Sequence, residues 1–356
     1  MKKLKAIAVL SAFSFLLASC TAADKASDID TSDKTASVIE KMTDEEKVAQ
    51  LFMVRCDSEN PEYMLLRQPG GIVMFSVDFE NLSEKEVKDK IKNFKKSCNI
   101  EPIIAVDEEG GTVVRVSSHT QLYNEKFKSP GEYFSEGGLE LVLEKEGEKS
   151  DLLRSLGITM NLAPVADVSQ NPSDFIYDRS LGQDAALTSE FTASAVNIMH
   201  EHNIMSCLKH FPGYGSNVDT HTGIAVDNRS IDEFRQNDFL PFKSGISAGT
   251  DAVLVAHNII TNIDSSCPAS ISAPVHDILR NELKFNGIIM TDDMSMQAMA
   301  EYEQPYKKAV LAGNDMIIVS DFDTAYNEVL DAVRSGEIPK DTLNNAVKNI
   351  LRAKEL

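Results

Sequence analysis

The segment from Lys209 to His221, which reads KHFPGYGSNVDTH, has the residue types and spacing best suited to chemistry. An apolar run ends in Lys209 and His210, a Pro-Gly turn follows, and Asp219 stands two residues before His221. Side chains at i and i+2 of an extended loop project to the same side, so Asp219 can hold the His221 ring in one tautomer. Because histidine titrates near neutral pH, such a pair can protonate a leaving oxygen and later deprotonate water. An isolated Asp-x-His pair is more often a solvated surface pair, so the rest of the chain must decide.

Three further segments carry groups that could attack a carbon atom or bind a hydroxyl group. In GIIMTDDMSM, Asp292 follows an apolar run, where a carboxylate serves either as a nucleophile or as a helix N-cap. In AVDEEGGTVVRV, Asp107 offers a short acceptor and Arg115 a forked donor, which suits a polyol, although the two can also form a simple ion pair. Arg179 lies in the third segment, DRSLG, which follows NLAPVADVSQNP.

Short apolar runs, which must position these residues, alternate with longer amphipathic stretches. The pattern predicts buried parallel strands separated by helices, that is, repeated strand-helix units. In the stretch 83–97, Val87, Ile91 and Phe94 share one helical face, and Ser83 with Glu86 forms a capping box. Thr43 with Glu46 forms another capping box before the stretch 44–54. The expected strands lie at 70–76, 102–107, 158–168, 206–211, 252–257, 287–293 and 316–321.

The number of runs favours a closed barrel over a doubly wound sheet. An eighth run is plausible near Leu51–Arg55, and no glycine-rich phosphate fingerprint follows the first run. We therefore predict a single (β/α)8 TIM barrel of the α/β class. Polar residues end the runs, and in a barrel those ends meet on one face, where active sites are built. They are Ser76, Asp107, Asp167, Lys209, His210, His257, Asp292 and Ser320.

These motifs together resemble glycoside hydrolase family 3. The pattern KHFPGxGxxxxDxH is similar to the signature of the family's single-domain β-N-acetylglucosaminidase branch, and the likeness runs from EKVAQLFMV to NNAVKNILRAKEL. The resemblance implies that Asp292 is the nucleophile, that Asp219 and His221 form the acid/base dyad, and that Asp293 is structural. It also implies sugar-binding roles for Asp107, Arg115, Arg179, Lys209 and His210.

The implied reaction is retaining exo-hydrolysis of β-linked N-acetylglucosamine through a covalent glycosyl-Asp intermediate, without a metal or an organic cofactor. Peptidoglycan fragments (muropeptides) are the expected substrates, and chitooligosaccharides are the alternative. Thr112 stands where the family usually has an Arg, and Tyr214 stands where a His is common. Both departures bear on substrate preference more than on bond breaking.

Three other activities are open to a chain of this pattern. Some relatives with the same dyad resemble phosphorylases, which transfer the glycosyl group to inorganic phosphate. A β-glucosidase or β-xylosidase typically has a Trp after the nucleophile and an acid/base Glu in an added domain, whereas this chain has Met294 there, contains no Trp and stops at Leu356. A lipid-anchored glycan-binding protein that had lost turnover would have no reason to keep all three catalytic residues.

The first residues predict export. Lysines at positions 2, 3 and 5 precede an apolar stretch and the sequence Leu17-Ala18-Ser19-Cys20, which resembles a bacterial lipobox. We expect a signal peptide at 1–19, acylation of Cys20 and location at the extracytoplasmic face of the membrane; the alternative is an ordinary secretory signal with an incidental cysteine. Residues 20–36 are polar and small, which predicts a flexible tether before a domain at 37–356.

Charge and cysteine content limit the remaining partners. The formal net charge of −20 disfavours binding to nucleic acid or to anionic lipid through charge, so the lipid on Cys20 is the expected membrane contact and the protein is expected to be a monomer. No CxxC pair or local His cluster has metal-ligand spacing. The remaining cysteines can form two disulfides or stay as buried thiols, and the sequence does not decide between these states. They are Cys56, Cys98, Cys207 and Cys267.

Overall fold

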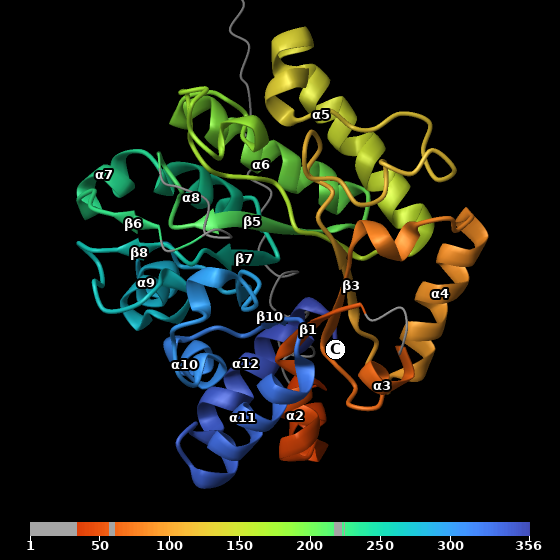
Figure 1. The fold of residues 1–356 in the computed structure, drawn as a ribbon, viewed down its shortest axis with the longest axis vertical. Coiled ribbons are helices and arrows are strands. Elements are labelled where there is room, and N and C mark those ends of the chain that lie inside the picture. The colour runs from red at the N-terminus through yellow and green to blue at the C-terminus, as the bar shows by residue number, and fades with distance from the viewer. Residues whose placement is uncertain (1–33, 57–60, 217–222, 224) are drawn as a thin grey trace, which may run out of the picture.

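The strands close into a parallel barrel (Figure 1), as predicted. The computed structural model describes residues 34–56, 61–216, 223 and 225–356. Its main sheet has eight strands in the order β10-β1-β2-β3-β4-β5-β7-β9, and a parallel bridge between Met290 and Met316 joins the two edges. The strands are β1 (Phe52–Arg55), β2 (Gly71–Met74), β3 (Ile103–Val106), β4 (Met160–Asn161), β5 (Met205–Phe211), β7 (Ala252–Val255), β9 (Ile288–Thr291) and β10 (Ile317–Val319).

Helices surround the barrel, as the ribbon in Figure 1 shows. A separate pair of short strands, β6 (Val226–Asp227) and β8 (Ile259–Ile260), lies between them. The helices, besides one at 34–41 and several short 3-10 or π turns, are α2 (Asp44–Gln50), α3 (Pro61–Leu65), α4 (Glu84–Ser97), α5 (Pro130–Leu156), α6 (Ala185–Glu201), α7 (Ile231–Gln236), α8 (Phe239–Ser247), α9 (Ala273–Asp277), α10 (Pro305–Ala312), α11 (Phe322–Ser335) and α12 (Lys340–Ala353).

All eight expected strands are confirmed, and so are both capping boxes, which begin α2 and α4. The long apolar run at 158–168 contributes only the two residues of β4. Pro164 interrupts it because proline has no amide hydrogen for the ladder, and Val165 then makes only an isolated bridge to Lys209.

The interior of the barrel is rich in sulfur-containing side chains. Met53, Met160, Cys207 and Met290 are all buried, and the Cys207 and Met290 sulfurs lie 3.9 Å apart. Gly71 is paired with Met53, and a Cβ at Gly71 would lie 3.0 Å from the Met53 Cε. Flexible methionines therefore fill an interior whose small residues leave uneven gaps.

The end of the chain crosses the amino ends of the strands. The Asn349 amide donates to Asp315, just before β10, and the Lys354 ammonium donates to the Gln50 side chain, just before β1. The Thr35 hydroxyl donates to the carbonyl of Leu356, so the helix at 34–41 begins on this same face.

The structure bears on the predictions for the first residues and for the cysteines. The helix at 34–41 begins before the predicted domain start at residue 37, because burial of Thr35 and Ile39 draws the preceding turn into the fold; the rest of the predicted tether, the signal peptide and Cys20 lie outside the described residues. In the described part of the chain no helix is long and apolar enough to cross a membrane. No disulfide links the four cysteines there, and three of the thiols are buried.

Candidate active site

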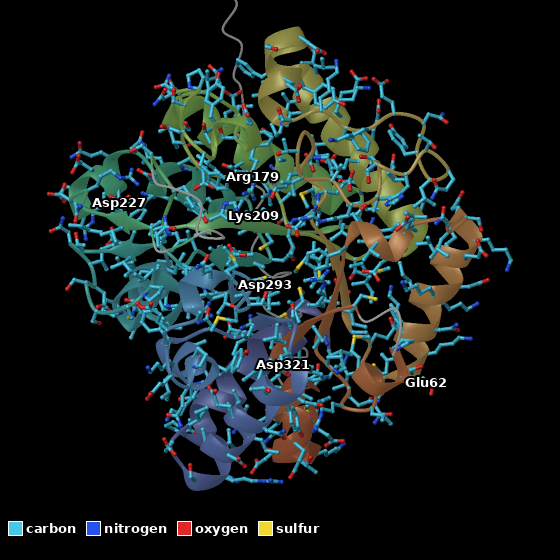
Figure 2. All side chains as sticks on the ribbon, viewed as in Figure 1. Glu62, Arg179, Lys209, Asp227, Asp293 and Asp321 are labelled. Atoms are coloured by element: carbon cyan, nitrogen blue, oxygen red, sulfur yellow. The ribbon has the colours of Figure 1, made fainter. Side chains whose placement is uncertain are left out.

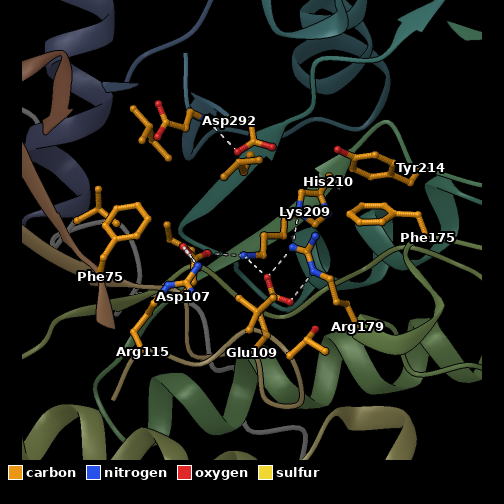
Figure 3. A pocket seen from close by; sticks show the side chains of 17 residues that line it. Phe75, Asp107, Glu109, Arg115, Phe175, Arg179, Lys209, His210, Tyr214 and Asp292 are labelled. Carbon is orange, nitrogen blue, oxygen red and sulfur yellow. Dashed lines mark hydrogen bonds and ion pairs between the residues drawn. The ribbon is translucent and has the colours of Figure 1, made fainter. Parts of the chain in front are cut away.

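Side chains that point into the barrel at the carboxyl ends of its strands build one cavity of about 380 Å³ (Figure 3). Paired residues of neighbouring strands face the same side, and alternate residues point inward. Arg55 pairs with Val73, and Val73 pairs with Ala105, so Phe75 and Asp107 continue the inward series. Figure 2 shows Arg179, Lys209 and Asp293 near the middle of the molecule, whereas Asp227 and Glu62 lie toward its edges.

Asp292 lies at the end of β9 and lines the cavity. Its backbone amide donates to the Val255 carbonyl at 2.9 Å, and one carboxylate oxygen accepts the Asp293 amide at 2.8 Å. Burial alone would raise the pKa of Asp292, but the His257 imidazole, the Asp293 amide and the Lys209 ammonium lower it below its usual range. Asp292 is therefore an ionised carboxylate that faces the cavity.

Lys209 joins two carboxylates at the closed end of the cavity (Figure 3). Its ammonium lies 2.6 Å from Asp107 and 2.6 Å from Glu109, and only 2% of its side chain is exposed. Burial alone would lower the pKa of Lys209, but the two carboxylates raise this pKa by more than burial lowers it. The ammonium group therefore stays cationic.

Glu109 is the centre of this network, and the sequence analysis did not single it out. Arg179 grips it with two hydrogen bonds, of 2.9 Å and 2.7 Å, in the forked geometry typical of arginine and carboxylate. Burial raises the pKa of Glu109, but Arg179 and Lys209 hold it far below its usual range. The available signal was its position two residues after Asp107, which indicates the same side of an extended chain.

Arg115 lies at the side of the cavity and has hydrogen-bond donors that are not used within the site. Its guanidinium lies 3.8 Å from Asp107, a long ion pair, and its buried Nε has no hydrogen-bond partner among the residues that the structure describes. The buried Glu108 carboxylate accepts the backbone amides of Arg115 and Val116 at 2.7 Å each, which fixes the loop that carries the guanidinium. A donor held this way is ready for a ligand oxygen.

Asp167 fixes the orientation of the His210 ring. One carboxylate oxygen of Asp167 lies 2.8 Å from the His210 Nδ1 and accepts the His210 amide, and the other accepts the Tyr214 amide at 2.7 Å. The Arg179 guanidinium, which can only donate, lies 3.0 Å from the His210 Nε2. The ring therefore carries its proton on Nδ1 and accepts at Nε2.

The turn after β5 needs glycine at Gly213. Its φ is +123°, and a Cβ there would lie 2.5 Å from an Asp238 carboxylate oxygen. Arg229 binds Asp238 at 2.8 Å and Asp227 at 2.7 Å, which fixes the chain at the other end of the loop. The predicted dyad, Asp219 and His221, lies outside the described residues.

The five predicted sugar-binding residues and Asp292 thus come together, as Figure 3 shows for all six. Tyr214, one of the two departures from the family pattern, is buried and stacks edge-on against His210 with ring centroids 5.1 Å apart. Thr112, the other, is exposed at the cavity rim. Phe75 and Phe175 also line the cavity, and no residue pattern had indicated them.

Some of the polar residues at the predicted strand ends do not line this cavity. The Ser76 hydroxyl bonds the His119 ring at 2.9 Å. The His257 ring instead bonds the Ser270 hydroxyl at 2.7 Å and the Asp293 carbonyl at 3.0 Å, so it supports the turn beside Asp292. Among residues 34–56, 61–216 and 225–356, no group of three or more acidic, His or Cys side chains is placed to hold a metal ion.

Comparison with known proteins relates this chain to glycoside hydrolases. The sequence model described as "Glycosyl hydrolase family 3 N terminal domain" matches residues 43–353. A beta-hexosaminidase from Idiomarina loihiensis is 32% identical over 287 residues, which is 77% of this chain and 83% of that protein. A beta-hexosaminidase from Stenotrophomonas maltophilia is 33% identical over 235 residues, 64% of this chain and 68% of that one.

Solved structures share the fold over most of the chain. A glycoside hydrolase family 3 β-N-acetylglucosaminidase from Paenibacillus sp. superposes with a TM-score of 0.81 at 27% identity, covering 88% of this chain. This chain spans 62% of that protein. M. tuberculosis LpqI superposes with a TM-score of 0.82 at 25% identity, covering 90% of this chain and 96% of that one.

Proposed function

Because this chain belongs to glycosyl hydrolase family 3 and is a glycoside hydrolase, we propose that it is a retaining exo-β-N-acetylglucosaminidase. The observation that carries the proposal is an ionised, partly exposed Asp292 facing a cavity whose closed end holds Lys209, His210 and Asp107. The names of its relatives, beta-hexosaminidase and β-N-acetylglucosaminidase, support the choice of sugar.

In the proposed first step, the Asp292 carboxylate attacks the anomeric carbon while the bond from that carbon to the leaving oxygen breaks. The leaving oxygen takes a proton from His221, which Asp219 orients. In the second step, water attacks the same carbon and gives its proton to His221, and Asp292 leaves as a carboxylate. The sugar keeps its β configuration because it is inverted twice.

The closed end of the cavity is suited to an uncharged sugar ring that carries several hydroxyl groups. Its cations and carboxylates neutralise one another, yet Asp107 and Arg115 keep acceptor and donor capacity because their ion pair is 3.8 Å long. A rigid set of fixed charges stabilises developing charge at the anomeric carbon without reorganising. Lys209, His210 and Arg179 complete this set of proposed sugar contacts.

We further propose that the substrates are muropeptides and that the protein acts as a monomer anchored by a lipid on Cys20. The helix at 34–41 begins at the amino ends of the strands, where Thr35 meets Leu356, and the cavity lies at the carboxyl ends. An anchor attached through this helix would therefore join the domain at the end opposite the mouth of the cavity.

The decisive experiment is hydrolysis of 4-nitrophenyl β-N-acetylglucosaminide by the wild type, Asp292→Ala and His221→Ala. Asp292→Ala should lower kcat by about 10⁴-fold, the order seen when a catalytic group is removed. His221→Ala should slow muropeptide and chitobiose cleavage more than aryl cleavage, because a nitrophenolate leaves without acid help.

Several outcomes would change the proposal. Equal inertness of the wild type and Asp292→Ala, with sugar still bound, would indicate a glycan receptor. Release of sugar 1-phosphate in phosphate buffer would indicate a phosphorylase. Faster release from chitobiose than from muropeptides would replace the proposed substrate. Labelling of Cys20 with a clickable fatty acid, lost in Cys20→Ser, tests the anchor.

A further inference from the structure

Arg55 is a cation to which no role has been assigned, and it stacks on Phe75, a residue that lines the cavity. It is the last residue of β1, and its pairing with Val73, which lines the cavity, turns its side chain toward the barrel axis. The other three residues of β1 are buried, whereas Arg55 is exposed. Its side chain therefore extends above the packed interior at the rim of the site.

The Arg55 guanidinium packs against an aromatic ring. It lies 4.4 Å from the ring centroid of Phe75, and Arg115 lies 5.4 Å from the same centroid. Among the described residues no ion pair joins Arg55 to an acid, although the chain as a whole has a formal net charge of −20. A stacked guanidinium keeps its forked donors free for an anion.

The depth of the cavity separates this cation from the groups that would hold the sugar. Lys209 and His210 at the closed end are 2% and 4% exposed, whereas Phe75 is half-buried and Arg55 is exposed. An exo-enzyme places its terminal sugar at the closed end, so the leaving group must lie toward the mouth. Asp293 also lines the cavity, and one of its carboxylate oxygens accepts the Ser295 amide at 2.9 Å.

On the premise of the proposed function, we infer that Arg55, seated on Phe75, selects leaving groups that carry a carboxylate. Arg55 is a specificity-determining residue that touches the aglycone and takes no part in bond breaking. An acidic protein needs such a local cation to accept an anionic leaving group, because its remaining surface repels one.

The test compares N-acetylglucosaminyl-β-1,4-N-acetylmuramic acid with its lactyl methyl ester, which removes the charge and adds only one methyl group. For Arg55→Ala, the ratio of kcat/KM on the acid to kcat/KM on the ester should fall about tenfold, the order of one lost charge-assisted hydrogen bond. Arg55→Lys should keep part of the ratio, since it keeps charge but loses the fork. Added salt should lower the wild-type ratio and leave that of Arg55→Ala unchanged.

Lys126→Ala is the matched control. Lys126 is also an exposed cation, and it lines a neighbouring cavity that shares Thr112 with the site. Its removal should leave both substrates at wild-type rates, and a loss with Lys126→Ala in place of Arg55→Ala would overturn the inference. So would an equal fall on acid and ester, or formation of sugar 1-phosphate that depends on Arg55. Failure of the wild type on both substrates would instead remove the proposed function itself.

Discussion

Carboxylates stand at both ends of the barrel, but the two ends use them differently. At the carboxyl end, Asp107, Glu109 and Asp292 line the cavity and face cations. At the amino end, Asp251 accepts the Ser206 amide at 2.8 Å, and Asp315 accepts the Ile289 amide at 2.8 Å, so each ties the starts of two neighbouring strands. Carboxylates therefore help to form the site at the carboxyl end and stabilise the fold at the amino end. In barrels of this kind, active sites lie at the carboxyl ends of the strands and the opposite face contributes to stability.

We therefore predict that loss of a carboxylate at the carboxyl end of the barrel will lower activity, whereas loss of one at the amino end will lower stability alone. The largest effect is expected for Glu109→Gln, which leaves Arg179 and Lys209 without their shared carboxylate. We expect kcat/KM to fall about 10³-fold, and the free energy of unfolding to fall by about 3 kcal/mol, the cost of breaking a buried ion pair. Steady-state kinetics and urea unfolding measure the two. Full activity in the folded variant would show that Glu109 is structural only.

Asp167→Asn is the next largest test at the carboxyl end. The new amide has one accepting oxygen in place of two, so it can no longer accept from the Tyr214 amide as well as from the His210 ring and backbone. Its NH2 group must oppose one of these donors, and the ring is held less firmly. We expect kcat/KM to fall by about 30-fold, the order of one charged hydrogen bond. Thermal unfolding of the same variant serves as its control. A stability loss without any change in KM or kcat would contradict the positioning role.

Asp315→Asn is the matched change at the amino end. It removes the ion pair with Arg280 and weakens the bond to the Ile289 amide. We expect the free energy of unfolding to fall by about 2 kcal/mol while kcat/KM of the folded enzyme stays at the wild-type value. Urea unfolding and active-site titration separate the two quantities. A large fall in kcat would mean that the ends of the barrel are coupled.

The smallest effect concerns His200, whose ring lies 2.8 Å from Asp251 at the amino end. The hydrogen bond to Asp251 raises the pKa of His200 above its usual 6.5. The folded state then binds the proton more tightly, so this stabilisation is full below about pH 6.5 and is lost as pH rises through the higher folded pKa. Because the pair is partly exposed, it should contribute less than about 1 kcal/mol. Urea unfolding of wild type and His200→Gln should differ at pH 5.5 and converge at pH 9; divergence at high pH would contradict the assignment.

The strands and several site residues were predictable because they depend on local sequence. Buried parallel strands read as unbroken apolar runs, and the polar residue that ends each run falls at the carboxyl edge of the sheet. Asp107, Lys209 and Asp292 were identified in this way, together with their motif. Arg115 lies in a loop and Arg179 in a short 3-10 helix, and the family resemblance indicated both before the structure brought them to the cavity.

Only the tertiary structure decided which side chains meet across the barrel. Glu109 lies 70 residues from Arg179 in the chain, and nothing local indicates that the two form an ion pair. Arg55 and Phe75 point inward together because of the register between β1 and β2, since a shift of one residue would turn one of them outward. The fate of the four cysteines likewise depended on their distances in space. Sequence thus determined the strands and the motif of the site, while closure of the barrel determined its charge network and its rim, because both arise from contacts between distant segments.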